Sequence, residues 1–225
     1  MKSLAHIFRD MVHHHERAEK SRASEYSEQA HYLPLSEQAR NQQAPTQPTA
    51  PSRQDVLNHL GYLADDYHLP RKLVYATAAA ESDFDVNEIH ENFAHDKHNR
   101  LVHDKQGNPI VKSVDYGLMQ INGPRINHDK VKDSAGRTAM ITDAVTRDWK
   151  ANAEAGVAIL KHNYDLIMLS EPPGASREDV ALATYAAYNH GQSHWHKFLE
   201  RDKRGVPRDG PVRNFYNKYQ TSPER

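Results

Sequence analysis

The chain has 225 residues, of which 37% are hydrophobic and 26% are charged, and its mean hydropathy is −0.88. That length suffices for one sizeable domain with a tail, and a composition this polar predicts that part of the chain lies outside a packed core. The 29 basic and 30 acidic residues nearly balance, which removes any electrostatic case for nucleic-acid binding. The lack of cysteine excludes disulfides and thiolate metal sites, and no apolar stretch is long enough to span a membrane.

Residues 1–52 are predicted to form a flexible N-terminal tail that ends in a linker. Charged and polar residues dominate as far as Arg40, and residues 41–51 are rich in proline and glutamine, which is typical of extended linkers. Apolar residues at helical spacing between Leu4 and Lys20 leave a short docking helix as the alternative to a frayed tail.

The folded domain is predicted to cover residues 53–225 and to open with two helices. Ser52 is a good N-cap, and apolar residues between Val56 and Ala64 recur on one face of the first helix. Pro70 suits the first turn of a second helix, which runs from Arg71 to about Ser82.

The second helix ends in the run Ala78-Ala79-Ala80-Glu81-Ser82-Asp83-Phe84. Helical spacing places Glu81 one step from Ala78, on or beside the buried side of the helix. Burial among apolar neighbours raises the pKa of a carboxyl group toward neutrality, as a general acid requires. The alternative is an ordinary solvated glutamate at a helix end.

Residues 98–114 change character. Short runs with β-branched residues, Arg100–Asp104 and Pro109–Val114, flank the glycine-containing segment Lys105–Asn108. This pattern predicts a β-hairpin, and because isolated hairpins are marginally stable we expect it to lie against the helical body.

After Asn122 the pattern is helical again. One helix is predicted from Trp149 to about Leu169, ended by residues 171–174, and another begins at a capping box formed by Ser176 and Asp179. Asn189-His190-Gly191 is typical of a helix C-terminus. We find no internal repeat.

Three other chemistries lack a motif. The segment His90-Glu91-Asn92-Phe93-Ala94-His95 has one residue too many for H-E-x-x-H, and histidines five apart lie about 140° apart on a helix, so they cannot readily share a zinc ion. No G-x-S-x-G nucleophile segment occurs. The ten glycines are scattered rather than gathered in a phosphate-binding loop.

Cleavage of a glycosidic bond needs one protonated carboxylic acid to deliver a proton to the bridging oxygen. Tyr188 and Asn189 could bring a hydroxyl and an amide to the same cleft as Glu81, and Gln120 could bring a further amide. Taken singly, Tyr185 and Tyr188 could equally be core residues with satisfied hydroxyls.

Three segments in this order resemble the soluble lytic transglycosylase (SLT) family of the lysozyme-like superfamily. They are Glu81-Ser82-Asp83-Phe84, Gly117-Leu118-Met119-Gln120-Ile121 and Ala187-Tyr188-Asn189-His190-Gly191. The helix containing Asn152 to Leu160 also looks like a family helix. The middle segment, read from Asp115 to Asn122, is especially similar to lytic enzymes associated with secretion and conjugation machines.

The resemblance implies a mainly α-helical, lysozyme-like (α+β) fold with a small β-hairpin and a substrate cleft. It implies peptidoglycan as the substrate, cut between N-acetylmuramic acid and N-acetylglucosamine, without metal or cofactor. Glu81 would protonate the leaving oxygen and then act as base on the muramoyl 6-hydroxyl, which closes a 1,6-anhydro ring. Gln120 and Asn189 match sugar-contacting positions, Tyr188 matches the tyrosine whose hydroxyl holds the glutamate, and Met119 would help to wall the cleft.

The chain also departs from the family pattern. The segment 98–114 looks like an insertion that removes any clear match for the family's serine, and Asn122 stands where many members have methionine. A hydrolytic muramidase would need a second carboxylate at about 5–9.5 Å, and Asp115 would favour hydrolysis if it faced Glu81. A non-catalytic glycan-binding module of the same fold is the alternative outside enzymes.

Peptidoglycan lies outside the cytoplasmic membrane, so we expect the protein to act in the periplasm or cell wall. Arg9 and Asp10 interrupt the apolar core that a standard signal peptide needs. Delivery by a secretion machine or a phage particle, through the N-terminal tail, is therefore the hypothesis. We expect no nucleic-acid partner.

Overall fold

Two helices, α3 (Arg53–Asp66) and α4 (Arg71–Ser82), open the folded part of the chain, as predicted. Ser52 caps α3 with a capping box, because its Oγ accepts from the Asp55 N–H and the Asp55 carboxylate accepts from the Ser52 N–H. The predicted apolar face of α3 is buried, and Pro70 directly precedes α4.

The computed structural model describes residues 50–170 and 174–224. Residues 1–49 of the predicted tail, with the alternative helix between Leu4 and Lys20, and residues 171–173 lie outside the described residues.

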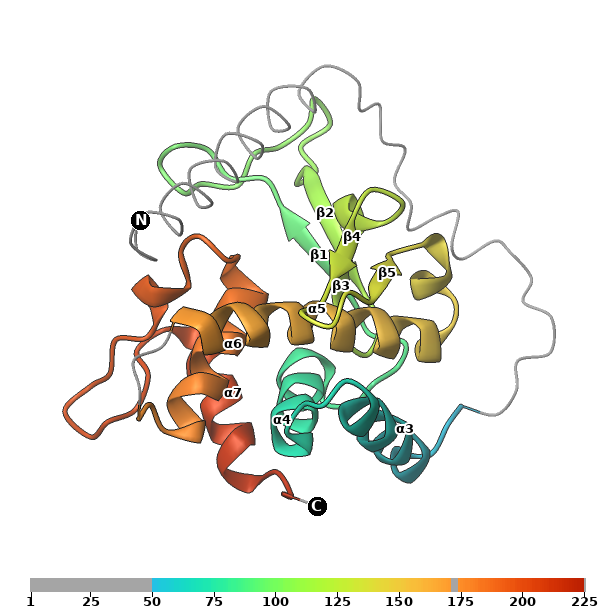
Figure 1. Cartoon of the computed structure of the whole chain (residues 1–225). Coiled ribbons are helices and arrows are strands. Elements are labelled where there is room, and N and C mark those ends of the chain that lie inside the picture. The colour runs from blue at the N-terminus through green and yellow to red at the C-terminus, as the bar shows by residue number, and fades with distance from the viewer. Residues whose placement is uncertain (1–49, 171–173, 225) are drawn as a thin grey trace, which may run out of the picture. The chain divides into compact units, whose positions relative to one another are not determined.

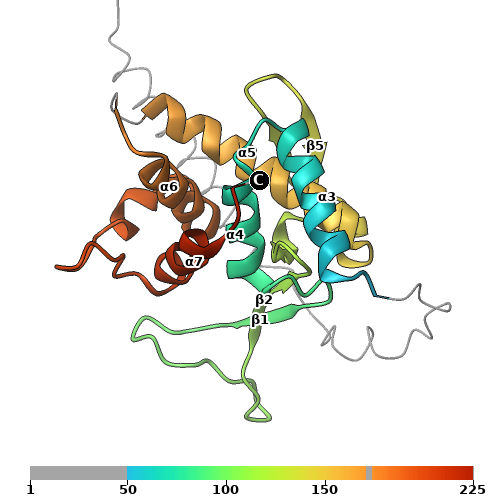
Figure 2. The same ribbon diagram turned by 90° about the horizontal axis from the view of Figure 1, so that it is seen from below.

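Three further helices complete the helical body: α5 (Trp149–Ser170), α6 (Arg177–His190) and α7 (Gly210–Thr221). Helix α5 packs against α3 and α6, while α4 packs against both α3 and α7 (Figures 1 and 2). The first two of these helices were predicted, and α7 was not. None of the described helices is long and apolar enough to cross a membrane.

Two small antiparallel sheets lie beside α5 (Figure 1). The first has the order β1-β2-β3, formed by Ile89–Phe93, Val111–Tyr116 and Ile121–Asn122. The second pairs β4 (Lys130–Lys132) with β5 (Thr138–Met140). The helical pattern expected after Asn122 begins only at Trp149. The residues between them form the second sheet and two short 3-10 helices, η1 (Gly123–Arg125) and η2 (Asp143–Thr146). A third 3-10 helix, η3 (Trp195–Phe198), follows α6. The mainly helical, lysozyme-like fold is confirmed.

The predicted hairpin of residues 100–114 is confirmed only next to its turn, where His103 pairs with Pro109 in an isolated antiparallel bridge. The partner of β2 is β1, and residues 94–110 between them form a forked arm that projects from the end of these strands (Figure 2). At the fork the Ala94 N–H donates to the Ile110 carbonyl, the Ile110 N–H to the Val102 carbonyl, and the Val102 N–H to the Ala94 carbonyl.

Each branch of the fork is closed by an aspartate that accepts hydrogen bonds from the turn. Asp96 Oδ1 accepts from the N–H groups of His98 and Arg100 at 2.8 and 3.1 Å, and Asp104 Oδ1 holds its own turn in the same way. These two turns reverse the chain within a few residues, so residues 100–104 form only isolated β-bridges and no continuous strand. The repeated turn also shows that residues 95–108 hold a short repeat that sequence analysis missed.

Candidate active site

Glu81 lies in the last turn of α4, at an end that α7 holds in place. The backbone turns left-handed at Asp83, with φ 51°. Asn214 Nδ2 on α7 donates to the Ala80 carbonyl oxygen at 3.1 Å, and Lys218 Nζ lies 2.7 Å from Asp83 Oδ1. Helix α7, which the sequence did not predict, therefore positions the central residue.

Glu81 is partly exposed as a residue, but its carboxyl group is largely covered. Its Oε1 is buried, and no group in the described part of the chain forms a hydrogen bond to it. Burial disfavours the charged form and is the largest cause of a rise that brings the pKa of Glu81 to about 7. Asp115 adds to the rise through its negative charge, whereas the Tyr185 hydroxyl and the Asn189 side chain act to lower the pKa. A carboxyl group with this pKa is half protonated near neutral pH, as a general acid requires.

Tyr185 belongs to the candidate site, although the sequence pattern did not distinguish it from a core aromatic. Its ring is 1% exposed and stacks on Phe215 of α7, with 4.4 Å between ring centroids. The stack fixes the position of the ring, and the Tyr185 hydroxyl interacts with the Glu81 carboxylate and lowers its pKa. The signal was present in the sequence, because Tyr185, Tyr188 and Asn189 follow the i, i+3, i+4 spacing of one helix face.

Tyr188 does not hold the glutamate in the way that the resemblance implied. Its hydroxyl donates to the Met119 carbonyl oxygen at 2.6 Å. A phenol has a single proton to donate, so this proton is not directed at Glu81. Burial first, and then the charge of Glu81, hold the pKa of Tyr188 well above its ordinary value. Tyr188 thus joins α6 to the segment after β2, close to the glutamate.

The segment after β2 is organised by one buried side chain. Asn152 on α5 is 0% exposed; its Oδ1 accepts from the Met119 N–H at 2.8 Å, and its Nδ2 donates to the carbonyls of Tyr116 and Val145 at 2.7 and 3.0 Å. Gly117 has φ 70°, and a Cβ atom there would lie 2.7 Å from Asn152 Nδ2. Glycine is therefore required both by the backbone angle and by the close approach of Asn152.

Met119 supports the site from inside the core. Its side chain is 0% exposed, and a Cβ atom on Gly156 would lie 2.3 Å from Met119 Cβ. The expectation that Met119 walls the cleft and touches the substrate is therefore not met by its side chain, because the approach of α5 at a glycine encloses it.

Gln120 and Asn189 lie at the surface of the same region. Gln120 is partly exposed, has φ 47°, and donates from Nε2 to the Gly117 carbonyl at 2.8 Å. Asn189 is exposed in the last turn of α6, and its side chain lowers the pKa of Glu81. Their contacts with a sugar stay predictions.

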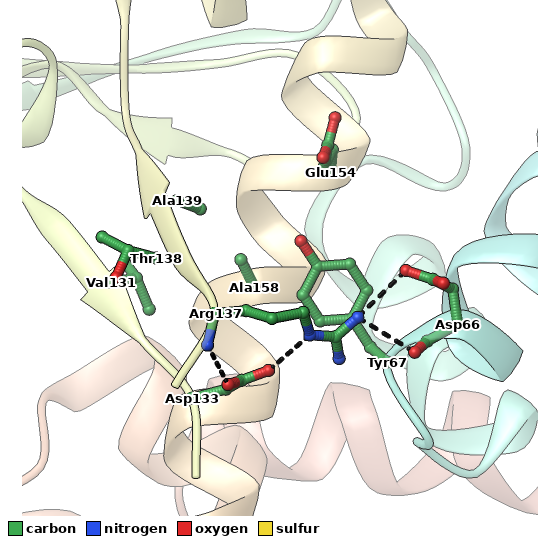
Figure 3. Close-up of a pocket in the computed structure, with 9 residues that line it drawn as sticks. All are labelled: Asp66, Tyr67, Val131, Asp133, Arg137, Thr138, Ala139, Glu154 and Ala158. Atoms are coloured by element: carbon green, nitrogen blue, oxygen red, sulfur yellow. Dashed lines mark hydrogen bonds and ion pairs between the residues drawn. The ribbon is translucent and has the colours of Figure 1, made fainter. Parts of the chain in front are cut away.

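The pocket that the structure outlines between the end of α3, the β4–β5 hairpin and α5 lies elsewhere (Figure 3). It measures about 370 Å³, and none of the predicted site residues lines it. Arg137 lines one side of this pocket. Its Nε donates to Asp133, its Nη1 donates to Asp66, and its guanidinium lies over the Tyr67 ring. These charged groups satisfy one another, so we interpret the pocket as a junction between elements. In residues 50–170 and 174–224 no three His, Asp or Glu side chains gather as a metal site.

Among the comparisons with known proteins, the one with family models gave a match. The family described as Transglycosylase SLT domain matches residues 60–207, well over half of the chain. Curated proteins and solved structures gave no significant match. The matched range contains α4 with Glu81, the segment after β2, and α6 with Tyr185, Tyr188 and Asn189. The chain belongs to the transglycosylase SLT family.

Proposed function

We propose that the protein is a lytic transglycosylase that cuts the β-1,4 bond between N-acetylmuramic acid and N-acetylglucosamine and leaves a 1,6-anhydro end. The SLT domain acts on the glycan strands of peptidoglycan, in the periplasm or cell wall. The observation that carries the proposal is the carboxyl group of Glu81, whose Oε1 is buried and whose pKa is raised to about 7, in the segment that resembles the family's glutamate motif.

Glu81 performs two proton transfers in this mechanism. Protonated Glu81 first donates to the glycosidic oxygen, the bond from that oxygen to the muramoyl C1 breaks, and positive charge develops on C1. The resulting carboxylate then takes the proton of the muramoyl 6-hydroxyl, whose oxygen bonds to C1 and closes the anhydro ring. Glu81 ends protonated, and a pKa near the working pH suits both steps.

The donors next to Glu81 act between these two steps. When Glu81 becomes a carboxylate, the Tyr185 hydroxyl and the Asn189 amide stabilise its charge, which is why both lower its pKa. The hydrogen bond from Tyr188 to Met119 holds the segment with Gln120 beside them. Tyr185 and Asn189 therefore stabilise Glu81 in the interval between the loss of its proton and the return of a proton.

A hydrolytic muramidase is the second candidate function. The observation in its favour is that the negative charge of Asp115 reaches Glu81, since two-carboxylate glycosidases use a second carboxylate to activate water or to stabilise the cation. In that case water, rather than the 6-hydroxyl, attacks C1.

Mass spectrometry of purified sacculi digested with the full chain distinguishes the two functions. We expect muropeptides with anhydro ends, each lighter by one water than its reducing counterpart. Reducing ends alone would establish hydrolysis and contradict the transglycosylase. Intact sacculi would contradict both.

We further propose that residues 1–52 form an address that brings the catalytic domain to a secretion machine or phage particle. The apolar residues at helical spacing between Leu4 and Lys20 support this role. Deleting residues 1–50 should leave the rate on purified wall within about twofold, because the deletion ends before the Ser52 cap. It should abolish recovery of the enzyme in the wall fraction of the producing cell. Unchanged recovery would show that the tail is no address.

A further inference from the structure

The carboxylate of Asp115 on β2 is held by two neutral amides. Asn92 Nδ2 donates to Oδ2 at 2.7 Å, and Asn122 Nδ2 donates to Oδ1 at 2.6 Å and also lies 3.1 Å from Ser113 Oγ. Each Asp115 oxygen therefore accepts a hydrogen bond from a side-chain amide. Because these partners are uncharged, they hold the group in place without neutralising it.

The register of the first sheet builds this clamp. Asp115 pairs with Asn122 across β2 and β3, while Asn92 pairs with Ser113, two residues from Asp115 on the same strand. Directly opposed side chains in an antiparallel pair have Cβ atoms about 5 Å apart, and diagonal neighbours stay within reach. One amide thus comes from each neighbouring strand, and Asn122 replaces the methionine that the resemblance led us to expect there.

The same sheet is fastened to the end of α4. Ser82 Oγ, on the residue after Glu81, donates to the Leu118 carbonyl oxygen at 2.9 Å, three residues after Asp115. The charge of Asp115 raises the pKa of Glu81 and contributes to the raised pKa of Tyr188. Glu81 and Asp115 therefore belong to one electrostatic site.

We propose that Asp115 is a second catalytic carboxylate, which stabilises the positive charge that develops on the muramoyl C1 when the glycosidic bond breaks. The two carboxyl groups have contrasting environments: burial, with a covered Oε1, raises the pKa of Glu81, whereas Asp115 accepts a hydrogen bond from an amide at each of its oxygens. Such a contrast separates the proton donor from the charged stabiliser. No covalent bond to Asp115 and no additional reagent is needed. The inference rests on the proposed function and takes a role that the substrate's acetamido group would otherwise fill.

The test is Asp115→Asn in the full chain, assayed on soluble, uncrosslinked glycan strands across pH. We expect kcat to fall on the order of 100-fold with little change in KM, because the lost stabilisation acts only on the developing cation. The groups that act on the charge of Glu81 are Tyr185 and Asn189 from α6 and Asp115 from β2. Losing the negative charge of Asp115 lowers the pKa of Glu81, so the alkaline fall in activity should move to lower pH.

Two matched variants accompany this test: one should shift the pH profile in the opposite direction, and the other should not shift it. Tyr185→Phe removes a donor that lowers the pKa of Glu81, so its alkaline fall should move to higher pH. Asp85→Asn, an exposed aspartate four residues from Glu81, should leave kcat and the profile unchanged. A carboxyl NMR titration of Glu81 in each protein measures the same shifts without turnover.

Asp115→Asn activity within threefold of wild type, with an unchanged pH profile, would overturn the role of Asp115 and leave Glu81 as the acid. For Asp115→Ala, added formate should restore part of the activity by supplying the missing negative charge. Failure of formate, together with a lowered melting temperature in both variants, would show that Asp115 is only structural and overturn the proposal. A wild-type protein that releases no fragments would overturn the proposed function and this inference with it.

Discussion

Glu81→Gln is expected to lower the rate of glycan cleavage by at least about 10³-fold, because one group provides both proton transfers. Glutamine keeps the size and polarity of the side chain but has no proton to donate at neutral pH. Release of soluble muropeptides from purified sacculi measures the loss. The exposed Glu154 on α5 provides the matched control, Glu154→Gln, which should retain wild-type activity.

The same variant should become more stable than wild type at alkaline pH. A carboxyl group with a raised pKa contributes stability that is fully present below its ordinary value of 4.5 and is lost as pH rises through about 7. That difference corresponds to about 3 kcal/mol at most. Chemical denaturation should show Glu81→Gln gaining about 1–3 kcal/mol over wild type at pH 8 and little at pH 4.

Two results would contradict the assignment of Glu81. Retained cleavage by Glu81→Gln would remove it from the chemistry. Equal stability of variant and wild type at pH 8 would show that the carboxyl group is not enclosed in solution. An inactive wild type that still bound glycan strands would instead favour a glycan-binding module.

Asn152→Ala is expected to destabilise the domain by about 3–5 kcal/mol, the largest effect on stability that we predict. The variant leaves the Met119 N–H and the carbonyls of Tyr116 and Val145 without their partner inside the core. Each buried group left unsatisfied costs about 1–3 kcal/mol. The melting temperature should fall by about 10 °C in a domain of this size, and activity should fall as well, because the segment with Gln120 loses its support.

The control for this variant lies on the same helix. Asn163 is also buried, at 2% exposure, but accepts a single side-chain hydrogen bond, from Gln192. Asn163→Ala should therefore cost clearly less than Asn152→Ala in thermal and chemical unfolding. An equal loss of stability in both variants would mean that removing any buried amide from α5 has this effect, and that the three hydrogen bonds of Asn152 are not its cause.

Local chemistry made α3 and α4 predictable, and other local chemistry limited the predicted hairpin to the residues next to its turn. The Ser52 cap and Pro70 act on the residues next to them, so sequence position alone located both helix starts. The run Arg100–Asp104 has strand-like residues, but the turns at Asp96 and Asp104 close on either side of it. Residues Val111–Tyr116 pair instead with β1, which lacks a clear alternating pattern in the sequence.

By itself the sequence determined the family, the principal helices and the candidate acid. Glu81, the middle segment with its single glycine, Gly117, and the Tyr188-Asn189 pair are recognised by residue type and order, which backbone requirements and chemistry impose locally. Only the tertiary structure decided that Met119 is enclosed, that Tyr188 bonds to Met119, and that Tyr185 and Asp115 act on Glu81. Desolvation and charge interactions depend on distances between segments far apart in the chain, and a local pattern does not contain those distances.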